Sequence, residues 1–384
     1  MVSLKTVRQS NAALQAFPPG IVAVFAGATQ GIGLATLKQF AKYVSGPKAY
    51  IIGRSHEKGK HIIDQLKILN PMGSFMFIEA QISKFAEVDR VCEEIKSLEN
   101  HVDILCMSMG YLSLGGRVET PEGIETNRAL QLYSRLRLTM NLLPHLERSM
   151  SPRIVSVLSA GFEGPLDLSD LDWKSHKSYS VFKAAAPAST MMNLFFEELA
   201  KDHPTVSFVH SFPGVVATNN VDNMFAHAPG LLWFPAQIPR YTVVPLLNMF
   251  AAISPDEAGE RTLFLATNAR YPPAEDHIEA RKMGGFVDRP QGVPFAASTI
   301  MKEGRGNGVY RVNSHGETCK DSALLKGYRK DDIGKVVWEH TMRVFAEALA
   351  NRDENGNGNE NGLREAEANV SDTDSLDFEL DLKS

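Results

Sequence analysis

Residues 21–33 of the chain read IVAVFAGATQGIG, an apolar run that leads into three closely spaced glycines. The run over 21–26 has the length and β-branched content of a buried strand, and helical periodicity begins at Ile32. Glycines between a strand and a helix let the backbone approach a pyrophosphate, which the helix N-terminus attracts. A glycine turn is often only structural, and its strand–turn–helix context is what favours a nucleotide site. The predicted cofactor contacts here are Gly27, Thr29, Gln30, Gly31, Ile32 and Gly33.

Short β-like runs alternate with longer helical patterns through the first 220 residues. Strands are expected at 21–26, 49–52, 75–79, 104–107, 154–158 and 206–210. Helices are expected at 32–43, 58–69, 85–98, 126–142 and 179–200. Such successive βα units imply right-handed crossovers, so the sequence predicts an α/β fold with a doubly wound parallel sheet.

The pattern loosens in the second half of the chain. A short helix at 5–16 is expected to pack against the edge of the sheet. Further helices are expected at 243–252, 254–266 and 333–350, with a seventh strand near 308–312. These elements predict a single domain over 1–350, with a cofactor half over 20–160 and substrate lid elements over 161–178 and 214–300.

The tail, residues 351–384, is rich in acidic residues, Asn and Gly and poor in apolar residues. Such a segment cannot bury enough surface to offset the entropy of ordering, so it is expected to be disordered. It carries a net −7, from ten acidic and three basic residues, and the other 350 residues carry +2. Its end, LDFELDL, is either part of a solubilising tail or a short docking motif.

The composition is that of a soluble globular protein, with 43% hydrophobic and 22% charged residues among 384. No apolar run reaches the roughly 18 residues of a spanning helix, and the N-terminal stretch lacks the apolar region of a secretion signal. Three cysteines without close Cys or His spacing predict neither a disulfide nor a bound metal. A nearly neutral body gives no support for nucleic-acid binding. We therefore expect a cytoplasmic protein with a small-molecule substrate, without nucleic-acid or integral membrane contact.

The second expected strand ends in Gly53-Arg54-Ser55, without an acidic residue. In dinucleotide-binding folds an acid near this position contacts the ribose 2′-hydroxyl, whereas an arginine accommodates a 2′-phosphate. Arg54 and Ser55 therefore favour NADPH over NADH. The alternative is that Arg54 is an ordinary solvated charge.

Tyr179 and Lys183 form the chain's only Y-x-x-x-K match. This spacing places both side chains on one face of a helix, although about half a match is expected by chance. Two strand ends give the match its weight: Ser159 lies upstream, and the sequence PGVVAT lies downstream at 213–218.

Together these motifs resemble the short-chain dehydrogenase/reductase family over about residues 20–270, and most of all its fungal secondary-metabolite members. The resemblance implies a Rossmann-like NAD(P)-dependent oxidoreductase in which Ser159, Tyr179 and Lys183 form the catalytic set. Tyr179 and Lys183 would also contact the cofactor. It implies homo-oligomers, dimers or tetramers, built through the helices that carry Gln131 and Tyr179. The implied loop along the nicotinamide contributes Pro213, Gly214, Val216 and Thr218.

Three positions depart from the family pattern. The segment MSMG at 107–110 keeps only the glycine, Gly110, that lets the backbone pass the adenosine. Gln81 stands where an aspartate commonly contacts adenine, and it can still accept and donate hydrogen bonds. Gln131 replaces the asparagine that completes a proton relay through water, so proton exchange with solvent is expected to be rerouted or slow.

In the implied reaction the cofactor exchanges hydride with a carbonyl carbon while Tyr179 exchanges a proton with its oxygen. The Lys183 ammonium favours the phenolate form, and the Ser159 hydroxyl orients the substrate oxygen. The leading function is reduction of a carbonyl, or oxidation of a secondary alcohol, on a bulky natural-product intermediate. Two alternatives stay open: a redox-neutral isomerase or cyclase on the same scaffold, and an NADP-binding scaffold or sensor with little catalysis.

Overall fold

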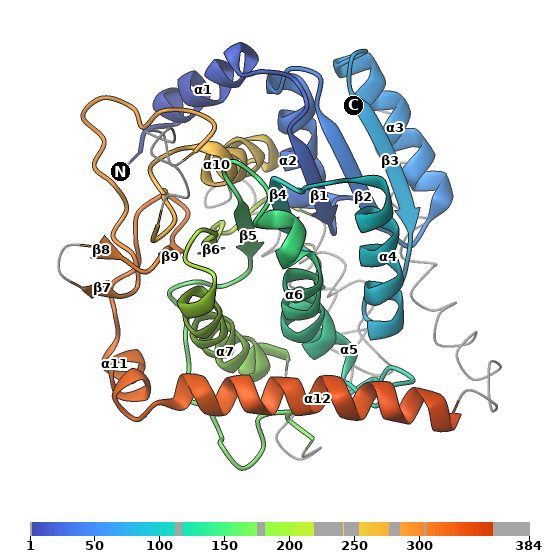
Figure 1. Cartoon of the computed structure of the whole chain (residues 1–384), viewed down its shortest axis with the longest axis vertical. Helices are drawn as coiled ribbons and strands as arrows, with labels where there is room; N and C mark the ends of the chain where they lie inside the picture. The colour runs from blue at the N-terminus through green and yellow to red at the C-terminus, as the bar shows by residue number, and fades with distance from the viewer. Residues whose placement is uncertain are drawn as a thin grey trace.

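The computed structural model describes residues 2–111, 117–174, 181–218, 241, 253–275, 285–302 and 305–355. Its central sheet has seven parallel strands in the order β3-β2-β1-β4-β5-β6-β9 (Figure 1). The strands are β1 (Val22–Ala26), β2 (Lys48–Gly53), β3 (Ser74–Glu79), β4 (Ile104–Met107), β5 (Arg153–Val157), β6 (Ser207–Ser211) and β9 (Val309–Val312). The strand order reverses between β1 and β4, the switch point where doubly wound sheets bind ligands.

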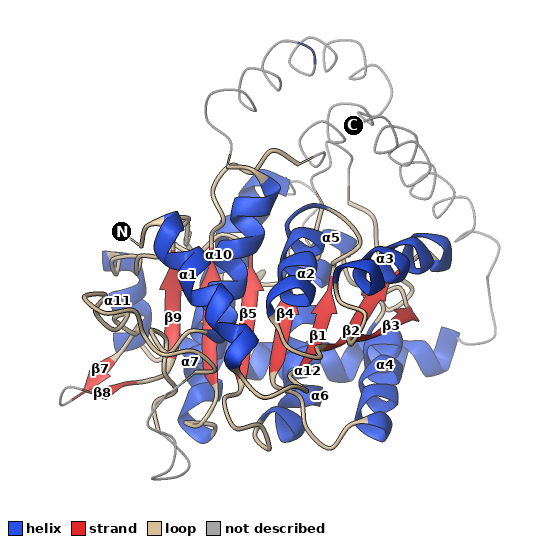
Figure 2. Ribbon diagram, turned by 90° about the horizontal axis from the view of Figure 1, so that it is seen from above, coloured by secondary structure: helices blue, strands red, loops and turns tan. Residues whose placement is uncertain are grey.

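Helices cover both faces of this sheet, as Figure 2 shows. One layer contains α1 (Leu4–Ala13), α2 (Gly31–Tyr43), α3 (His56–Leu69) and α10 (Pro255–Thr267). The other contains α4 (Phe85–Leu98), α6 (Ser134–Leu146), α7 (Val181–Asp202) and α12 (Ile333–Asn355). Side chains of β1 alternate between the two cores, with Val24 in one and Phe25 in the other. The two cores share one sheet, so the chain is a single α/β domain.

The six strands expected in the first half are present, and so is the seventh, close to the expected bounds. The helix expected at 126–142 is interrupted. It consists of α5 (Thr126–Arg128), a π-helical turn η2 (Ala129–Tyr133) and α6. The helix expected at 243–252 lies outside the described residues.

The N-terminal helix α1 packs on α10 of its own layer rather than on the edge of the sheet, so that prediction was wrong. Arg8 Nε lies 2.7 Å from Glu260 Oε2, and Asn11 Nδ2 donates to the Glu260 carbonyl at 2.9 Å. Val7 of α1 is buried in the core of this layer. These contacts join residues about 250 positions apart, which no local pattern reveals.

Several elements were not expected from the sequence. The antiparallel pair β7 (Met301–Lys302) and β8 (Arg305–Gly306) and the helix α11 (Ala323–Lys330) are too short for a periodic signal. The last three residues of the helix expected at 5–16 form a separate short turn, η1 (Leu14–Ala16). Helix α12 continues past residue 350, and residues 356–384 of the tail lie outside the described part.

Among the described residues, no helix is long and apolar enough to cross a bilayer.

Helix α12 crosses the outside of the second layer (Figure 1). The Trp338 ring stacks on Phe195 of α7 with a centroid distance of 4.7 Å. Further along, Phe345 packs edge-on against Phe85 of α4 at 5.2 Å. Large aromatic side chains thus bind this helix to the body of the domain.

Candidate active site

The glycine turn after β1 is packed closely against the end of β4. Gly27 has a φ of +83°, and a Cβ there would lie 2.4 Å from the backbone nitrogen of Met109. A Cβ on Gly33 would lie 2.3 Å from the carbonyl oxygen of Gly27. Only glycine fits these two positions, as a turn that cradles a dinucleotide requires.

Helix α2 begins directly after this turn. Its N-cap residue, Gln30, makes no side-chain hydrogen bond to the first turn of this described helix, which also contains no acidic residue. Its free N–H groups and the positive end of its dipole therefore suit an anionic group. Together with the glycine turn, this N-terminus fits the pyrophosphate of a nicotinamide dinucleotide.

The divergent segment at 107–110 supports the glycine turn. Ser108 N donates to the Ala26 carbonyl at 2.9 Å, which extends the pairing of β1 with β4. The Ser108 hydroxyl donates to the Gly27 carbonyl, also at 2.9 Å. Its oxygen occupies the space that a Cβ on Gly33 would enter. The departure from the family pattern therefore leaves a well-packed turn.

The segment 213–218 leaves β6 and reaches the start of α2. A Cβ on Gly31 would meet Thr218 Cγ2 at 3.4 Å, so Thr218 lies beside the glycine turn. Backbone hydrogen bonds to Ile253 hold the middle of the segment, and Val216 is buried. Pro213 and Gly214 precede these contacts, directly after the strand. This placement agrees with the predicted loop along a cofactor.

The other end of the predicted cofactor site lies at the ends of β2 and β3. A Cβ on Gly53 would lie 2.5 Å from Thr29 Cγ2, so the glycine turn packs on the end of β2. Arg54 follows and is exposed. The Ser55 hydroxyl caps α3, because it accepts from Lys58 N at 3.3 Å.

Two further residues flank this end. Gln81 follows β3 and is half-buried. Tyr111 follows Gly110 and was missed by the sequence analysis. Burial and the Glu125 carboxylate raise the pKa of Tyr111 to about 12, while the Arg54 charge opposes the rise. Arg54 and Tyr111 therefore lie within electrostatic range of each other.

Ser159 stands just beyond the end of β5. Its hydroxyl oxygen is buried and has no hydrogen-bond partner among the described residues. Its backbone, in contrast, is held on both sides: Ser159 N donates to His210 Nε2 at 3.3 Å, and Ser189 Oγ donates to the Ser159 carbonyl at 2.7 Å. The backbone of Ser159 is thus fixed, while its hydroxyl has no partner among the described residues. This arrangement suits a side chain that hydrogen-bonds a ligand.

Gln131 lies in the π-helical turn η2 and is 7% exposed. A Cβ on Gly110 would lie 3.9 Å from Gln131 Cγ, so the two residues are neighbours at the end of β4. Single π-helical turns inside α-helices often occur at functional sites. Gln131 is therefore placed at the predicted site, while its role there stays a prediction.

The Tyr179 and Lys183 pair is only partly described. Tyr179 lies outside the described residues. The backbone of Lys183 lies in the first turn of α7, and its side chain is outside the described part. The other predicted site residues, apart from Gln131 in η2, follow the carboxyl ends of adjacent strands β3, β2, β1, β4, β5 and β6, and the topology brings them to one edge of the sheet.

A family model described as short chain dehydrogenase matches residues 21–229 of the chain. The match covers more than half of the sequence, and the protein belongs to the short-chain dehydrogenase family. Its fold and glycine turn agree with that membership, and it is an oxidoreductase of the nicotinamide-dependent type. The resemblance inferred from the motifs is thereby confirmed.

Fungal oxidoreductases are among its relatives. A protein of Emericella nidulans named oxidoreductase AN1596 is 41% identical over 91% of this chain and 99% of its own length. An Aspergillus protein named NmrA-like family domain-containing oxidoreductase notO is 37% identical over 91% of this chain and 96% of its own. A solved structure from Mycobacterium paratuberculosis, 16% identical, covers 86% of this chain and 96% of its own with a TM-score of 0.53, which supports the fold alone.

Proposed function

We propose that the protein is an NADPH-dependent reductase of a ketone or aldehyde, or a dehydrogenase of a secondary alcohol in the reverse direction. The observation that carries the proposal is the Ser159 hydroxyl. It is buried, has no partner among the described residues and stands one strand away from the end of β4, against which the glycine turn packs. A hydroxyl kept free in that position can hydrogen-bond a substrate oxygen.

The remaining roles follow from this placement. The nicotinamide, when bound, supplies hydride to the substrate carbon or accepts it. Tyr179 donates a proton to the developing alkoxide, and Lys183 favours the phenolate and holds the ribose hydroxyls of the cofactor. Gln131, beside Gly110, stands where the family's relay asparagine would complete the path of the proton to solvent, so this exchange is rerouted or slow.

Arg54 supports the choice of NADPH. It is exposed at the end of β2, directly beyond the strand end on which the glycine turn packs. No acidic residue occupies this strand end to bind a ribose 2′-hydroxyl. A guanidinium there can pair with the 2′-phosphate through two hydrogen bonds.

We further propose a bulky, largely apolar natural-product substrate, handled in the cytoplasm. The part of the lid segment that lies between Ser159 and Tyr179 supports a large substrate, because it is held in place by contacts with distant parts of the chain. Leu166 N donates to Tyr328 Oη at 2.7 Å, and Arg117 Nη1 donates to the Trp173 carbonyl at 2.7 Å. The fungal origin of the oxidoreductase relatives agrees with such a substrate.

The cofactor preference is tested by titrating the protein with NADPH and NADH and following nicotinamide fluorescence. We expect Arg54→Gln to weaken NADPH binding by about 10-fold to 100-fold, the value of charge-assisted hydrogen bonds to a phosphate, and to leave NADH unaffected. Lys60→Gln, an exposed charge change on α3, is the control. Equal affinity of the wild type for both cofactors would contradict the preference.

The chemistry is tested with NADPH and phenanthrenequinone as a bulky diketone probe. Tyr179→Phe and Ser159→Ala should each lower kcat by about 100-fold or more, since each removes a group acting on the developing alkoxide. Tyr43→Phe, at the far end of α2, is the matched control and should keep full activity. A native substrate converted to a product of unchanged mass would favour the isomerase or cyclase instead.

A further inference from the structure

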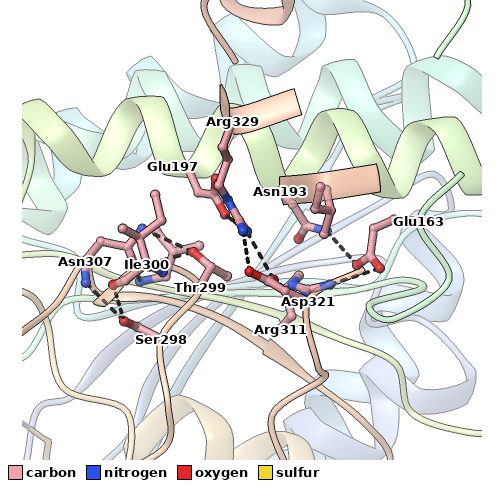
Figure 3. Close-up of polar contacts among 12 residues, drawn as sticks. Glu163, Asn193, Glu197, Ser298, Thr299, Ile300, Asn307, Arg311, Asp321 and Arg329 are labelled. Carbon is pink, nitrogen blue, oxygen red and sulfur yellow. Dashed lines mark hydrogen bonds and ion pairs between the residues drawn. The ribbon is translucent and has the colours of Figure 1, made fainter. Parts of the chain in front are cut away.

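A buried row of polar side chains links the backbone of Ser159 to the C-terminal part of the chain. It passes through His210 of β6, Asn193 of α7 and Glu163 to Arg311 of β9. Figure 3 shows the part of this row from Asn193 through Glu163 to Arg311. The side chains of the four linked residues are at most 3% exposed. Burying a polar group costs free energy unless the group is hydrogen-bonded or paired with an opposite charge, so the orientation of these side chains is tightly specified.

The direction of each hydrogen bond follows from the charged end of the row. The Glu163 carboxylate lies 3.0 Å from Arg311 Nη1 and can only accept, so Asn193 Nδ2, 2.7 Å from Glu163 Oε1, donates to it. This turns the amide oxygen of Asn193 toward His210 Nδ1 at 2.7 Å. Because that oxygen can only accept, His210 carries its proton on Nδ1 and a lone pair on Nε2.

The lone pair on His210 Nε2 accepts the hydrogen bond from Ser159 N at 3.3 Å. The Glu163 carboxylate contributes a second time, because Gly161 N donates to its Oε1 at 2.9 Å. The carbonyl of Ser159 is held by the Ser189 hydroxyl. The turn that carries Ser159 is therefore fixed through its backbone, and the serine hydroxyl makes no hydrogen bond to the residues that the structure describes.

The surroundings of His210 keep its ring neutral. Burial, followed by the charges of Arg135 and Arg311, lowers the pKa of His210 to about 3. Asn193, the side chain on its other nitrogen, is uncharged. A protonated ring would aim a second N–H at the Ser159 N–H, and the contact between them would be lost.

We propose that His210 is a positioning residue that holds Ser159 by its backbone N–H, and that Asn193 and Glu163 select the tautomer that it needs. The inference rests on the proposed function for the role of the Ser159 hydroxyl. His210 does not touch the substrate in this arrangement. It acts through the orientation of Ser159, and a misplacement of about 1 Å can cost on the order of 100-fold in rate.

The first test reads the tautomer directly. Long-range proton–nitrogen correlation spectra of the whole protein, labelled with 15N-histidine, distinguish the two neutral forms and the charged ring. The His210 signals are assigned by their loss in His210→Gln. We expect the Nδ1–H form near pH 7 and still near pH 5, whereas Asn193→Leu should allow the other tautomer.

The second test compares two substitutions that differ in reach. His210→Gln places an amide oxygen near the Nε2 position and keeps an acceptor for Ser159 N, whereas His210→Asn is too short. With NADPH and phenanthrenequinone, we expect His210→Asn to lower kcat by about 10-fold to 100-fold and His210→Gln by less than about threefold. The KM for NADPH should be unchanged in both, since neither touches the glycine turn.

Arg329→Lys serves as the control at the outer end of the same polar region. Arg329 pairs with Glu197 at 2.7 Å and with Asp321 (Figure 3). We expect this variant to lower the melting temperature and to keep kcat. Amide hydrogen exchange of the peptide that contains Ser159 should accelerate about 10-fold in His210→Asn and stay unchanged in Arg329→Lys.

An Nε2–H tautomer or a charged ring near pH 7 would overturn the proposal, as would wild-type kcat together with wild-type exchange in His210→Asn. If the wild type does not turn over the diketone, the failure belongs to the proposed function. The tautomer and the exchange of the Ser159 amide then still decide whether His210 holds the serine backbone.

Discussion

At the scale of single residues, Arg135 supports the ends of two strands that carry the site. Arg135 is 1% exposed, and its guanidinium donates to the carbonyls of Met107 and Val157 and to the Ser156 hydroxyl. It also donates to the Met109 carbonyl, next to Gly110. Burial lowers the pKa of Arg135 to about 9, so the side chain is charged near neutral pH. A buried cation held by neutral acceptors thus joins β4 to β5, and its charge adds to the effect of burial in lowering the pKa of His210.

His210 makes the stability of the fold depend on pH. The ordinary pKa of histidine is 6.5, and the pKa of His210 in the folded chain is about 3. Between these values the unfolded chain binds the extra proton, so the free energy of unfolding falls with falling pH, by up to about 1.4 kcal/mol per pH unit. Urea denaturation of the wild type and of His210→Gln over this range measures the effect.

Glutamine does not titrate, so the free energy of unfolding of His210→Gln should fall less steeply with falling pH than that of the wild type. Carboxylates titrate in the same range in both proteins, and their contribution cancels in the difference. If the free energies of unfolding of the two proteins changed in parallel with pH, His210 would not be held neutral by the fold.

At the scale of elements, α11 and α12 hold the segment that leads to Tyr179. Asp172 Oδ1 accepts from Tyr133 Oη at 2.6 Å and from His340 Nε2 of α12 at 2.8 Å. Burial alone would raise the pKa of Asp172, but the hydrogen bonds from His340 and Tyr133 lower it. Tyr328 of α11 holds the same segment at Leu166. The C-terminal helices therefore position a segment that lies about 160 residues earlier in the chain.

Removing the Trp338 ring should loosen α12. Trp338 is partly buried and stacks on Phe195, so Trp338→Ala is expected to lower the free energy of unfolding by about 3 kcal/mol. Val336→Ala, at an exposed position of the same helix, should change it by less than about 0.5 kcal/mol. Urea denaturation followed by circular dichroism measures both. Equal midpoints for the two variants would mean that α12 contributes little to stability.

At the scale of the whole molecule, α12 covers part of the surface on which the family resemblance places subunit contacts. The resemblance implies dimers built through the helices that carry Gln131 and Tyr179. In this chain Trp338 of α12 stacks on Phe195 of α7. Phe345 of α12 packs against Tyr133, which lies in the turn before α6. A subunit docking there would have to displace buried aromatic side chains.

We therefore expect the full chain to be monomeric at micromolar concentration. Light scattering coupled to size-exclusion chromatography should report a mass near the 42.3 kDa of one chain. Deletion of residues 356–384 should not alter the assembly state, since α12 remains. A dimer whose cross-links map to α7 would contradict this expectation and would require α12 to move.

The sequence by itself determined the layered fold and the edge of the sheet at which we expect the site. Strand runs and helix periods are local signals, and parallel βα units must bring their carboxyl ends to one edge, so Gly27, Gly110, Ser159 and Pro213 were placed from the sequence. The sequence also indicated Arg54, because the lack of an acidic residue at the end of the second strand is visible in the sequence itself.

Only the tertiary structure decided how those strand ends are held. The contact of His210 with Ser159 spans 51 positions, and that of Arg8 with Glu260 spans 252. Neither leaves a periodic signal, since a buried polar pair forms only when packing brings distant segments together. The tautomer of His210, the π-helical turn at Gln131 and the course of α12 depend on such contacts. These features follow from which groups remain to be paired once the two cores have formed around the sheet.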